Sequence, residues 1–196
     1  MEVTVTSKIA IYGEIVMSTV DGPGERAVVH FAGCNIGCAG CFNPQTHDAT
    51  APGVWRDSAQ SIAAKMLAVS PRVTISGGEP TDQFDGLRDL LVALRSLGCE
   101  DIVMFTGRTV EWLRSRYDWS SIEDEKLVDV VIDGPFVKNR LAINGMRGSD
   151  NQRIIPVTDK WSPDDFEARE IEFTLDSDGR VFITGFPDET MRSLLA

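Results

Sequence analysis

Three cysteines fall within eight residues of this 196-residue chain, at Cys34, Cys38 and Cys41. A secreted disulfide framework spreads its cysteines and pairs them, so three crowded thiols indicate metal ligation instead. Each of the three directly follows a glycine, and glycine lets the backbone approach a ligand closely. The fourth cysteine, Cys99, is distant and is interpreted as an ordinary buried or half-buried thiol. The triplet is therefore the candidate metal site.

The spacing of the triplet is C-x3-C-x2-C. Four cysteine ligands would saturate a four-iron cluster, whereas three leave one iron without a protein ligand. An open coordination position indicates chemistry rather than a purely structural role, as it does at catalytic zinc. The alternative is a zinc ion with His47 as the fourth ligand, although zinc motifs usually come as two separated pairs. We favour the iron–sulfur interpretation.

A second glycine-containing segment, Gly77-Gly78-Glu79-Pro80, follows an apolar run further along the chain. The glycines would open backbone groups to a ligand, and Glu79 offers a carboxylate to a ligand's ammonium group. On its own the segment is weak evidence, because a turn that carries a charged residue has the same composition. Its place after a predicted strand makes it a second candidate element of the site.

Strand-like and helical segments alternate along the chain. Short apolar runs predict strands at residues 27–31, 72–76, 101–105 and 127–132, and apolar residues at helical spacing predict helices at 58–69, 84–97 and 110–117. This alternation predicts a parallel sheet with helical crossovers. The chain is too short for a closed eight-fold barrel of about 250 residues, so we predict an α/β fold with an open partial (β/α) barrel.

The residues that could bind a ligand or take part in catalysis follow the predicted strands. The cysteines, Gly77–Glu79, Thr106 and Asp133 each come after the end of a different strand. Because α/β sheets bind ligands at the carboxyl ends of their strands, we expect one site at that edge.

The C-terminal part of the sequence departs from this alternation of strands and helices. Residues 170–175 and 180–184 flank a glycine-containing turn and predict a β-hairpin, and a short helix is expected near 188–195. Length and a hydrophobic content of 42% fit one domain with an ordinary core. We therefore predict a single domain over residues 1–196, with a core at about 9–157 and a hairpin extension at about 158–196.

The net charge is −11, with 30 acidic and 19 basic residues. A negative surface argues against contacts to a nucleic-acid backbone. No stretch approaches the roughly 18 apolar residues of a membrane span, and the N-terminus lacks the pattern of a signal peptide. We expect a cytoplasmic protein with neither nucleic acid nor membrane as a partner.

The C-x3-C-x2-C spacing resembles the signature of the radical S-adenosylmethionine (SAM) superfamily. Further segments resemble its activating enzymes of glycyl radical proteins, above all those of anaerobic (class III) ribonucleotide reductase, in which glycine precedes and an aromatic residue follows the third cysteine. The matching segments are DGPGER at 21–26, Gly40, Phe42, Asn43-Pro44, FTG at 105–107, VIDGPF at 131–136, RGSDNQR at 147–153 and ITGFP at 183–187. The resemblance covers about residues 9–187.

This resemblance implies a [4Fe-4S] cluster on Cys34, Cys38 and Cys41, with SAM on the open iron. It implies that Gly77, Gly78 and Glu79 face the methionine end of SAM and that Thr106 contacts the ribose or the carboxylate, local packing of Thr106 being the alternative. It also implies an oxidoreductase that cleaves SAM reductively and generates a glycyl radical on the large anaerobic ribonucleotide reductase subunit. A flavodoxin- or ferredoxin-type protein is the implied electron donor.

Asp133 and Arg153 are the candidate catalytic residues. Asp133 would face the radical site or the partner's loop, with turn capping as the alternative. Arg153 belongs to a polar run with Arg147, Asn151 and Gln152 that suits carboxylate or backbone recognition. The chain has His47 and Arg108 where the family often has tryptophan and tyrosine. These departures leave open a radical SAM enzyme that acts on another protein or a small molecule, and a zinc-binding adaptor is the non-enzymatic alternative.

Overall fold

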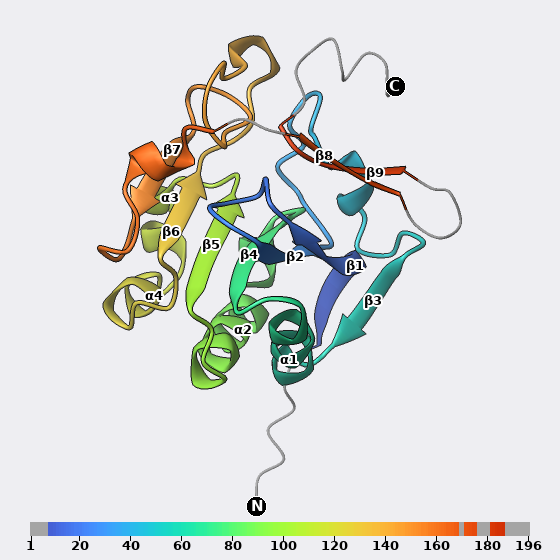
Figure 1. Cartoon of the computed structure of the whole chain (residues 1–196), viewed down its shortest axis with the longest axis vertical. Coiled ribbons are helices and arrows are strands. Elements are labelled where there is room, and N and C mark those ends of the chain that lie inside the picture. Colours follow the sequence, from blue (N-terminus) through green and yellow to red (C-terminus); the bar gives the residue numbers. More distant parts are fainter. Residues whose placement is uncertain (1–7, 169–170, 176–180, 187–196) are drawn as a thin grey trace, which may run out of the picture.

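A seven-stranded sheet with strand order β3-β1-β2-β4-β5-β6-β7 forms the centre of the molecule (Figure 1). The structure is a computed structural model that describes residues 8–168, 171–175 and 181–186. The strands of this sheet are β1 (Ile9–Ser18), β2 (Arg26–Phe31), β3 (Val54–Asp57), β4 (Arg72–Gly77), β5 (Asp101–Thr106), β6 (Val130–Asp133) and β7 (Arg153–Pro156). The sheet is open, with β3 and β7 at its two edges.

The sheet is mixed rather than parallel throughout. The four predicted strands are present as β2, β4, β5 and β6, and each pairs with the next in parallel. The strands β1, β3 and β7 pair antiparallel and were not predicted. Two of them have four residues each, and the pairing of β1 with β2 shifts register between Tyr12 and Val16, which breaks the strand alternation. The α/β class is confirmed, and a partial barrel of the radical SAM type stays a prediction.

Helices connect the parallel strands. They are α1 (Ala59–Val69), α2 (Phe84–Ser96), α3 (Val110–Arg116) and α4 (Ser120–Asp124), with short 3-10 helices η1 (Pro44–Thr46), η2 (Pro80–Gln83), η3 (Lys138–Arg140) and η4 (Pro163–Phe166). Ser58 and Thr109 cap α1 and α3 through their side-chain oxygens. The three predicted helices are confirmed, whereas α4 was not predicted. None of the helices in the described part of the chain has the length and apolar content that a membrane span requires.

Alternate residues of the strands build two apolar layers. On one face of the sheet, Val29, Phe31 and Ile75 belong to the main core with the apolar stripes of α1 and α2. On the other face, Val103 and Ile132 pack with a smaller cluster that includes Met146 and Phe166. Both faces of the parallel strands are therefore covered, as expected for this class of sheet.

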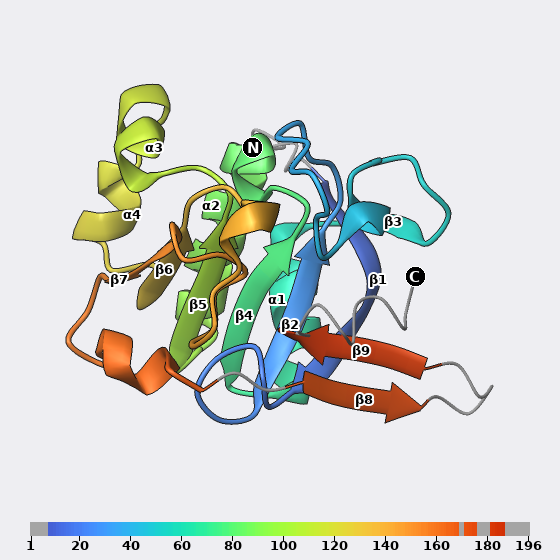
Figure 2. The same cartoon turned by 90° about the horizontal axis from the view of Figure 1, so that it is seen from above.

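The C-terminal strands β8 (Ile171–Leu175) and β9 (Val181–Gly185) form a separate antiparallel pair (Figure 2). Glu172 of β8 accepts a hydrogen bond from the amide of Thr19 at 3.2 Å, which joins this pair to the end of β1. The residues that join β8 to β9, and the helix predicted near 188–195, lie outside the described residues. The predicted domain boundaries stay a prediction.

A buried ion pair lies at the amino end of the parallel strands. Arg26 and Asp101 have fully buried side chains that meet at 2.7 Å. The guanidinium of Arg26 also donates to the hydroxyl of Thr74 at 2.8 Å and to the carbonyls of Pro23 and Val73 at 3.0 and 2.8 Å. The Arg26 side chain thus joins three neighbouring strands to the loop that precedes β2.

Candidate active site

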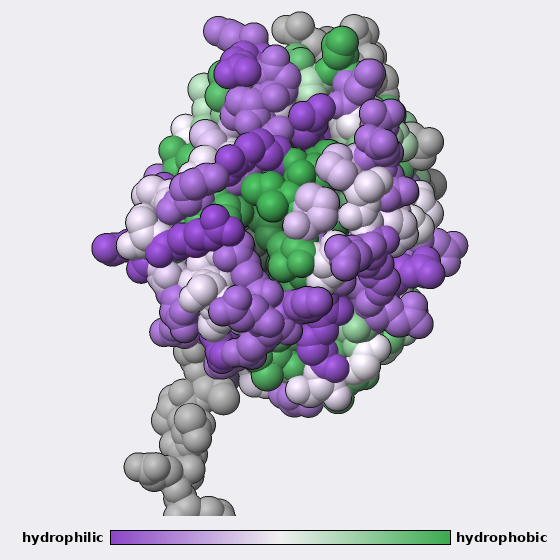
Figure 3. Space-filling view, turned by 90° about the vertical axis from the view of Figure 1, so that its left-hand side faces the viewer, coloured by the Kyte–Doolittle hydropathy of each residue, from purple (hydrophilic) through white to green (hydrophobic). Residues whose placement is uncertain are grey.

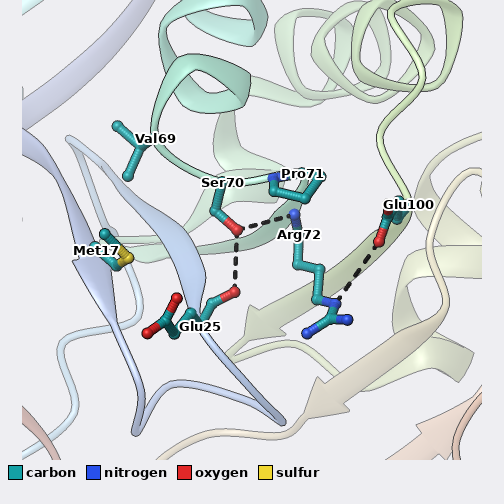
Figure 4. Close-up of a pocket in the computed structure, with 7 residues that line it drawn as sticks. All are labelled: Met17, Glu25, Val69, Ser70, Pro71, Arg72 and Glu100. Carbon is teal, nitrogen blue, oxygen red and sulfur yellow. Dashed lines mark hydrogen bonds and ion pairs between the residues drawn. The ribbon is translucent and has the colours of Figure 1, made fainter.

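Two cavities lie at opposite ends of the parallel strands. The larger, of about 360 Å³, lies where β4 and β5 begin (Figure 4). Its polar contacts are the hydrogen bonds of Ser70 with the Glu25 carbonyl and the Arg72 amide, and the ion pair of Arg72 with Glu100 at 3.8 Å. Ligand sites of α/β folds form at the opposite, carboxyl ends of the strands. The smaller cavity at that edge is the candidate active site.

The smaller cavity has a volume of about 120 Å³ and is lined by segments that follow four parallel strands. The cysteine loop follows β2, Gly77–Glu79 ends β4, Phe105–Gly107 ends β5, and Gly134 with Phe136 follows β6. The lining residues are Cys34, Ile36, Cys38, Cys41, Phe42, Asn43, His47, Ser76, Gly77, Gly78, Glu79, Phe105, Thr106, Gly107, Gly134, Phe136 and Gln152. This volume is below the roughly 300–1,000 Å³ of a pocket that encloses an organic ligand. The cavity that the described residues form is therefore too small to enclose a ligand of that size by itself.

All three cysteine side chains line this cavity and are partly buried. Burial raises the pKa of the Cys34 thiol, while hydrogen bonds from the amides of Ile36 and Gly37 act in the opposite direction. The amide of Asn43 donates to Cys41 Sγ at 3.4 Å. Amides directed at the sulfur atoms favour the thiolate form and tune a bound cluster.

The thiols do not meet at a single metal position. Among the described residues, no group of three or more histidine, cysteine, aspartate or glutamate side chains converges on one metal ion. Three cysteines around one cavity, with amides directed at the sulfur atoms of Cys34 and Cys41, instead fit a body larger than one ion. The donor set therefore fits an iron–sulfur cluster better than the zinc alternative.

The cysteine loop and the Gly77–Glu79 segment are in direct backbone contact. The amides of Gly78 and Glu79 donate to the carbonyls of Phe31 and Gly33, both at 2.8 Å. A Cβ atom on Gly78 would lie 2.3 Å from the Gly33 oxygen, and one on Gly77 would lie 2.4 Å from the Phe31 nitrogen. Gly77 also has φ of +111°, which L side chains rarely adopt. Both glycines are needed for this approach.

Glu79 contributes the carboxylate of the cavity. Its side chain is fully buried. Oε1 accepts hydrogen bonds from the Thr81 amide at 3.0 Å and from the Thr81 hydroxyl at 2.6 Å. It also accepts one from the Thr106 hydroxyl at 2.8 Å. Oε2 accepts a hydrogen bond from the Gly107 amide at 2.8 Å. Burial raises the pKa of Glu79 despite these bonds. The structure thus brings Thr106 to the cavity as a direct partner of Glu79.

Asp133 and Arg153 lie elsewhere. They are register partners on β6 and β7, and the Arg153 guanidinium donates to both Asp133 oxygens, with Nε at 2.9 Å from Oδ1. Asp133 also accepts from the Val110 amide at 2.8 Å, at the start of α3, and Arg153 pairs with Glu111. Neither Asp133 nor Arg153 lines the cavity. The structure does not bring these two candidates to the cysteines, and their contacts are those of an ion pair that holds α3 against the sheet edge.

The polar run 147–153 packs against residues that line the cavity. The Gln152 amide group accepts from the Gly148 amide at 2.8 Å and donates to the Gly134 carbonyl at 2.8 Å. A Cβ atom on Gly148 would lie 2.7 Å from the ring of Phe42, whose centroid is 4.9 Å from that of Phe136. The run therefore packs against the residue that follows Cys41.

Two residues that the sequence analysis singled out have contacts near the cysteines. His47 lines the cavity, and its carbonyl accepts a hydrogen bond from the Cys34 amide at 3.1 Å. The Arg108 guanidinium donates to the Asn35 side chain, lies 3.7 Å from Asp82 and stacks 4.5 Å from the Trp112 ring centroid. The sequence had singled out His47 as a possible zinc ligand and both positions as departures from the family pattern, but it contained no signal for these contacts.

Comparison with known proteins identifies the family of the chain. Residues 20–155, more than half of the chain, match the family described as "4Fe-4S single cluster domain". The anaerobic ribonucleoside-triphosphate reductase-activating protein of Enterobacteria phage T4 is 33% identical, over 74% of this chain and 93% of that protein. The chain belongs to the radical SAM activating enzymes. As a member of that family it is an oxidoreductase whose cofactors are a [4Fe-4S] cluster and SAM.

Other members of the radical SAM activating enzymes differ in how much of their length is matched. The activating protein of the same name from Salmonella typhi is 28% identical, over 69% of this chain and 90% of that protein. The pyruvate formate-lyase-activating enzyme of Clostridium pasteurianum is 35% identical, and the chain spans only 40% of its length. The match to the pyruvate formate-lyase-activating enzyme is thus partial.

Proposed function

We propose that this chain activates the large anaerobic ribonucleotide reductase subunit by generating a glycyl radical on it. The observation that carries the proposal is the extent of similarity. Two relatives with that printed activity are matched over 93% and 90% of their length, whereas the Clostridium pasteurianum relative named for pyruvate formate-lyase is matched over 40%. A flavodoxin- or ferredoxin-type protein in the cytoplasm is the proposed electron donor.

The proposed roles of the chain's own residues follow from the cavity. Cys34, Cys38 and Cys41 hold the cluster, and the amides directed at the sulfur atoms of Cys34 and Cys41 favour the ligating thiolates. When bound, the cluster and SAM together supply a 5′-deoxyadenosyl radical for abstraction of hydrogen from a backbone glycine. The protein positions the cluster and SAM and prevents side reactions.

The cavity also contains groups that suit the methionine end of SAM. The Gly77–Glu79 segment lines the cavity and is fixed there by its backbone bonds to the cysteine loop, and Glu79 provides a buried carboxylate for an ammonium group. Thr106 fixes the Glu79 carboxylate through its hydroxyl. We propose Gly77, Gly78, Glu79 and Thr106 as the SAM-binding residues. Asp133 and Arg153 are proposed as residues that position the β6–β7 edge.

The decisive test is the formation of the radical. The reconstituted protein, SAM, a reductant and the large reductase subunit are incubated without oxygen, and electron paramagnetic resonance is recorded. We expect a glycyl-type doublet on the large subunit and stoichiometric methionine. A doublet that forms only with another glycyl radical protein would contradict the proposed target and support the alternative in which the enzyme acts on a different protein.

Replacing Glu79 with glutamine is expected to weaken SAM binding about tenfold. The buried carboxylate is lost, and the new amide group would face the Gly107 amide, which is also a donor. The raised pKa of Glu79 also sets a pH dependence. As the pH falls through that pKa the carboxylate becomes protonated, so wild-type affinity should decline at a higher pH than for an ordinary glutamate.

Calorimetric titration of SAM into the reconstituted protein, without reductant, measures both effects. The Glu79→Gln variant should show a flat pH profile at low affinity. Glu125→Gln is the matched control, because Glu125 is an exposed carboxylate paired with Arg88 away from the cavity. Equal SAM affinity in wild type and Glu79→Gln would remove Glu79 from the proposed site.

A further inference from the structure

A basic loop adjoins the active-site cavity. Residues 135–149, here called the rim loop, contain Lys138, Arg140 and Arg147 and no aspartate or glutamate, in a chain with net charge −11. In Figure 1 this segment stands above the end of β6, at the same edge of the sheet as the cysteine loop. The local charge is thus opposite to that of the chain as a whole.

The rim loop is held rigidly at its base. Leu141 and Ser149 form a β-bridge, and the Val137 amide donates to the Ser149 hydroxyl at 3.0 Å. The Met146 amide donates to the Phe166 carbonyl at 2.8 Å, and the Met146 side chain is buried in the smaller core. A surface that is fixed before binding loses little conformational entropy when a partner docks.

The tip of the rim loop exposes an apolar side chain. Ile143 is 88% exposed, more than any other large apolar side chain in the described residues. Its neighbour Ala142 is buried, so the loop directs Ile143 away from the protein. Lys138 is exposed on the same loop and has no ion-pair partner among the described residues, whereas Arg140 is paired with Asp150 at 2.6 Å. An exposed isoleucine and an unpaired lysine on the same loop offer a partner an apolar anchor and a positive charge.

The loop leads directly into the cavity. Phe136 lines it and contacts Phe42, the residue after Cys41. Figure 3 shows the side of the molecule with β7, α3 and α4, where an apolar area is surrounded by hydrophilic side chains. Because Phe136 of the rim loop lines the cavity, a partner segment bound on this loop would lie next to the cavity.

We propose that the rim loop docks the segment of the large reductase subunit that carries the target glycine, and that this segment presents acidic and apolar side chains. The proposal rests on the proposed function and adds the surface and the chemistry of its partner. Lys138 steers the acidic side chains, and Ile143 anchors an apolar one.

The test measures binding of the reconstituted holoenzyme with SAM to the large reductase subunit, by anaerobic calorimetry at two salt concentrations. The variant Lys138→Glu/Ile143→Asp is expected to bind about tenfold or more weakly and to lose part of the salt dependence. The control Lys126→Glu/Leu97→Asp likewise replaces a lysine and an exposed aliphatic residue, near the opposite end of the sheet, Leu97 being 44% exposed, and should bind like wild type. Formation of 5′-deoxyadenosine with reductant alone should be equal in all three proteins.

The possible outcomes distinguish an error in the docking surface from an error in the proposed function. If wild type binds the large subunit and forms the glycyl radical but the rim-loop variant binds equally well, the docking surface is wrong and the function stands. If both double variants weaken binding equally, the effect is general and the inference is overturned. If wild type neither binds the subunit nor forms the radical, both proposals are wrong.

Discussion

Single replacement of Cys34, Cys38 or Cys41 with alanine is expected to reduce cluster-bound iron about tenfold or more and to abolish 5′-deoxyadenosine formation. Each thiol lines the same cavity, and a cluster with only two protein ligands loses most of its attachment. The measurement is iron and sulfide content after anaerobic reconstitution, together with chromatography of the SAM cleavage products. Circular dichroism then distinguishes loss of the cluster from loss of the fold.

Cys99→Ala is the matched control. Cys99 is a buried thiol whose Sγ lies 3.4 Å from the carbonyls of Pro71 and Asp101, away from the cavity. Its replacement should leave iron content and SAM cleavage unchanged and lower stability by about 1 kcal/mol through loss of packing. Retained iron in all three single variants of the cysteine loop would contradict the site. One zinc and no iron in the wild type would support the zinc alternative.

Arg26→Met is expected to destabilise the protein by about 3–5 kcal/mol, out of a typical total of about 5–15 kcal/mol. The substitution leaves Asp101 fully buried without its cation, and Asp101 Oδ1 already has no hydrogen-bond partner. It also leaves the carbonyls of Pro23 and Val73 without the guanidinium donors. Anaerobic urea denaturation of the holoenzyme, followed by circular dichroism, measures the loss.

Two further variants identify the cause. Arg88→Met removes an exposed ion pair with Glu125 and should cost about 0–1 kcal/mol. Arg26→Met/Asp101→Leu removes both buried charges and should recover part of the stability lost in the single variant. A double variant no more stable than Arg26→Met would show that the unpaired Asp101 charge is not the reason for the loss.

The sequence predicted the parallel centre of the fold because those strands are strong apolar runs that alternate with helices. The runs that became β2, β4, β5 and β6 are buried on both faces, which makes them visible without any alignment. The edge strands β3 and β7 have only four residues, and their pairing depends on the folded sheet. Such strands carry little local signal.

The sequence predicted the site residues that are brought together by the ends of parallel strands. It did not predict the contacts that depend on how strands pair. Cys34, Glu79 and Thr106 share a cavity because parallel strands end at one edge. The pairing of Asp133 with Arg153 follows from the register of β6 with β7, and β7 was not predicted. The contact of Arg108 with Asn35 joins side chains 73 residues apart, which no local pattern contains.

The backbone contact between the cysteine loop and the Gly77–Glu79 segment bears on how the metal site is assembled. The amides of Gly33 and Cys34 also donate to the carbonyls of Thr46 and His47, at 2.7 and 3.1 Å. The fold alone thus fixes the position of the first ligand, unlike in zinc fingers, which unfold without metal. We expect loading with iron and sulfide to be a local ordering event. A molecule whose cluster has been destroyed by oxygen would then keep its fold and could be repaired rather than degraded.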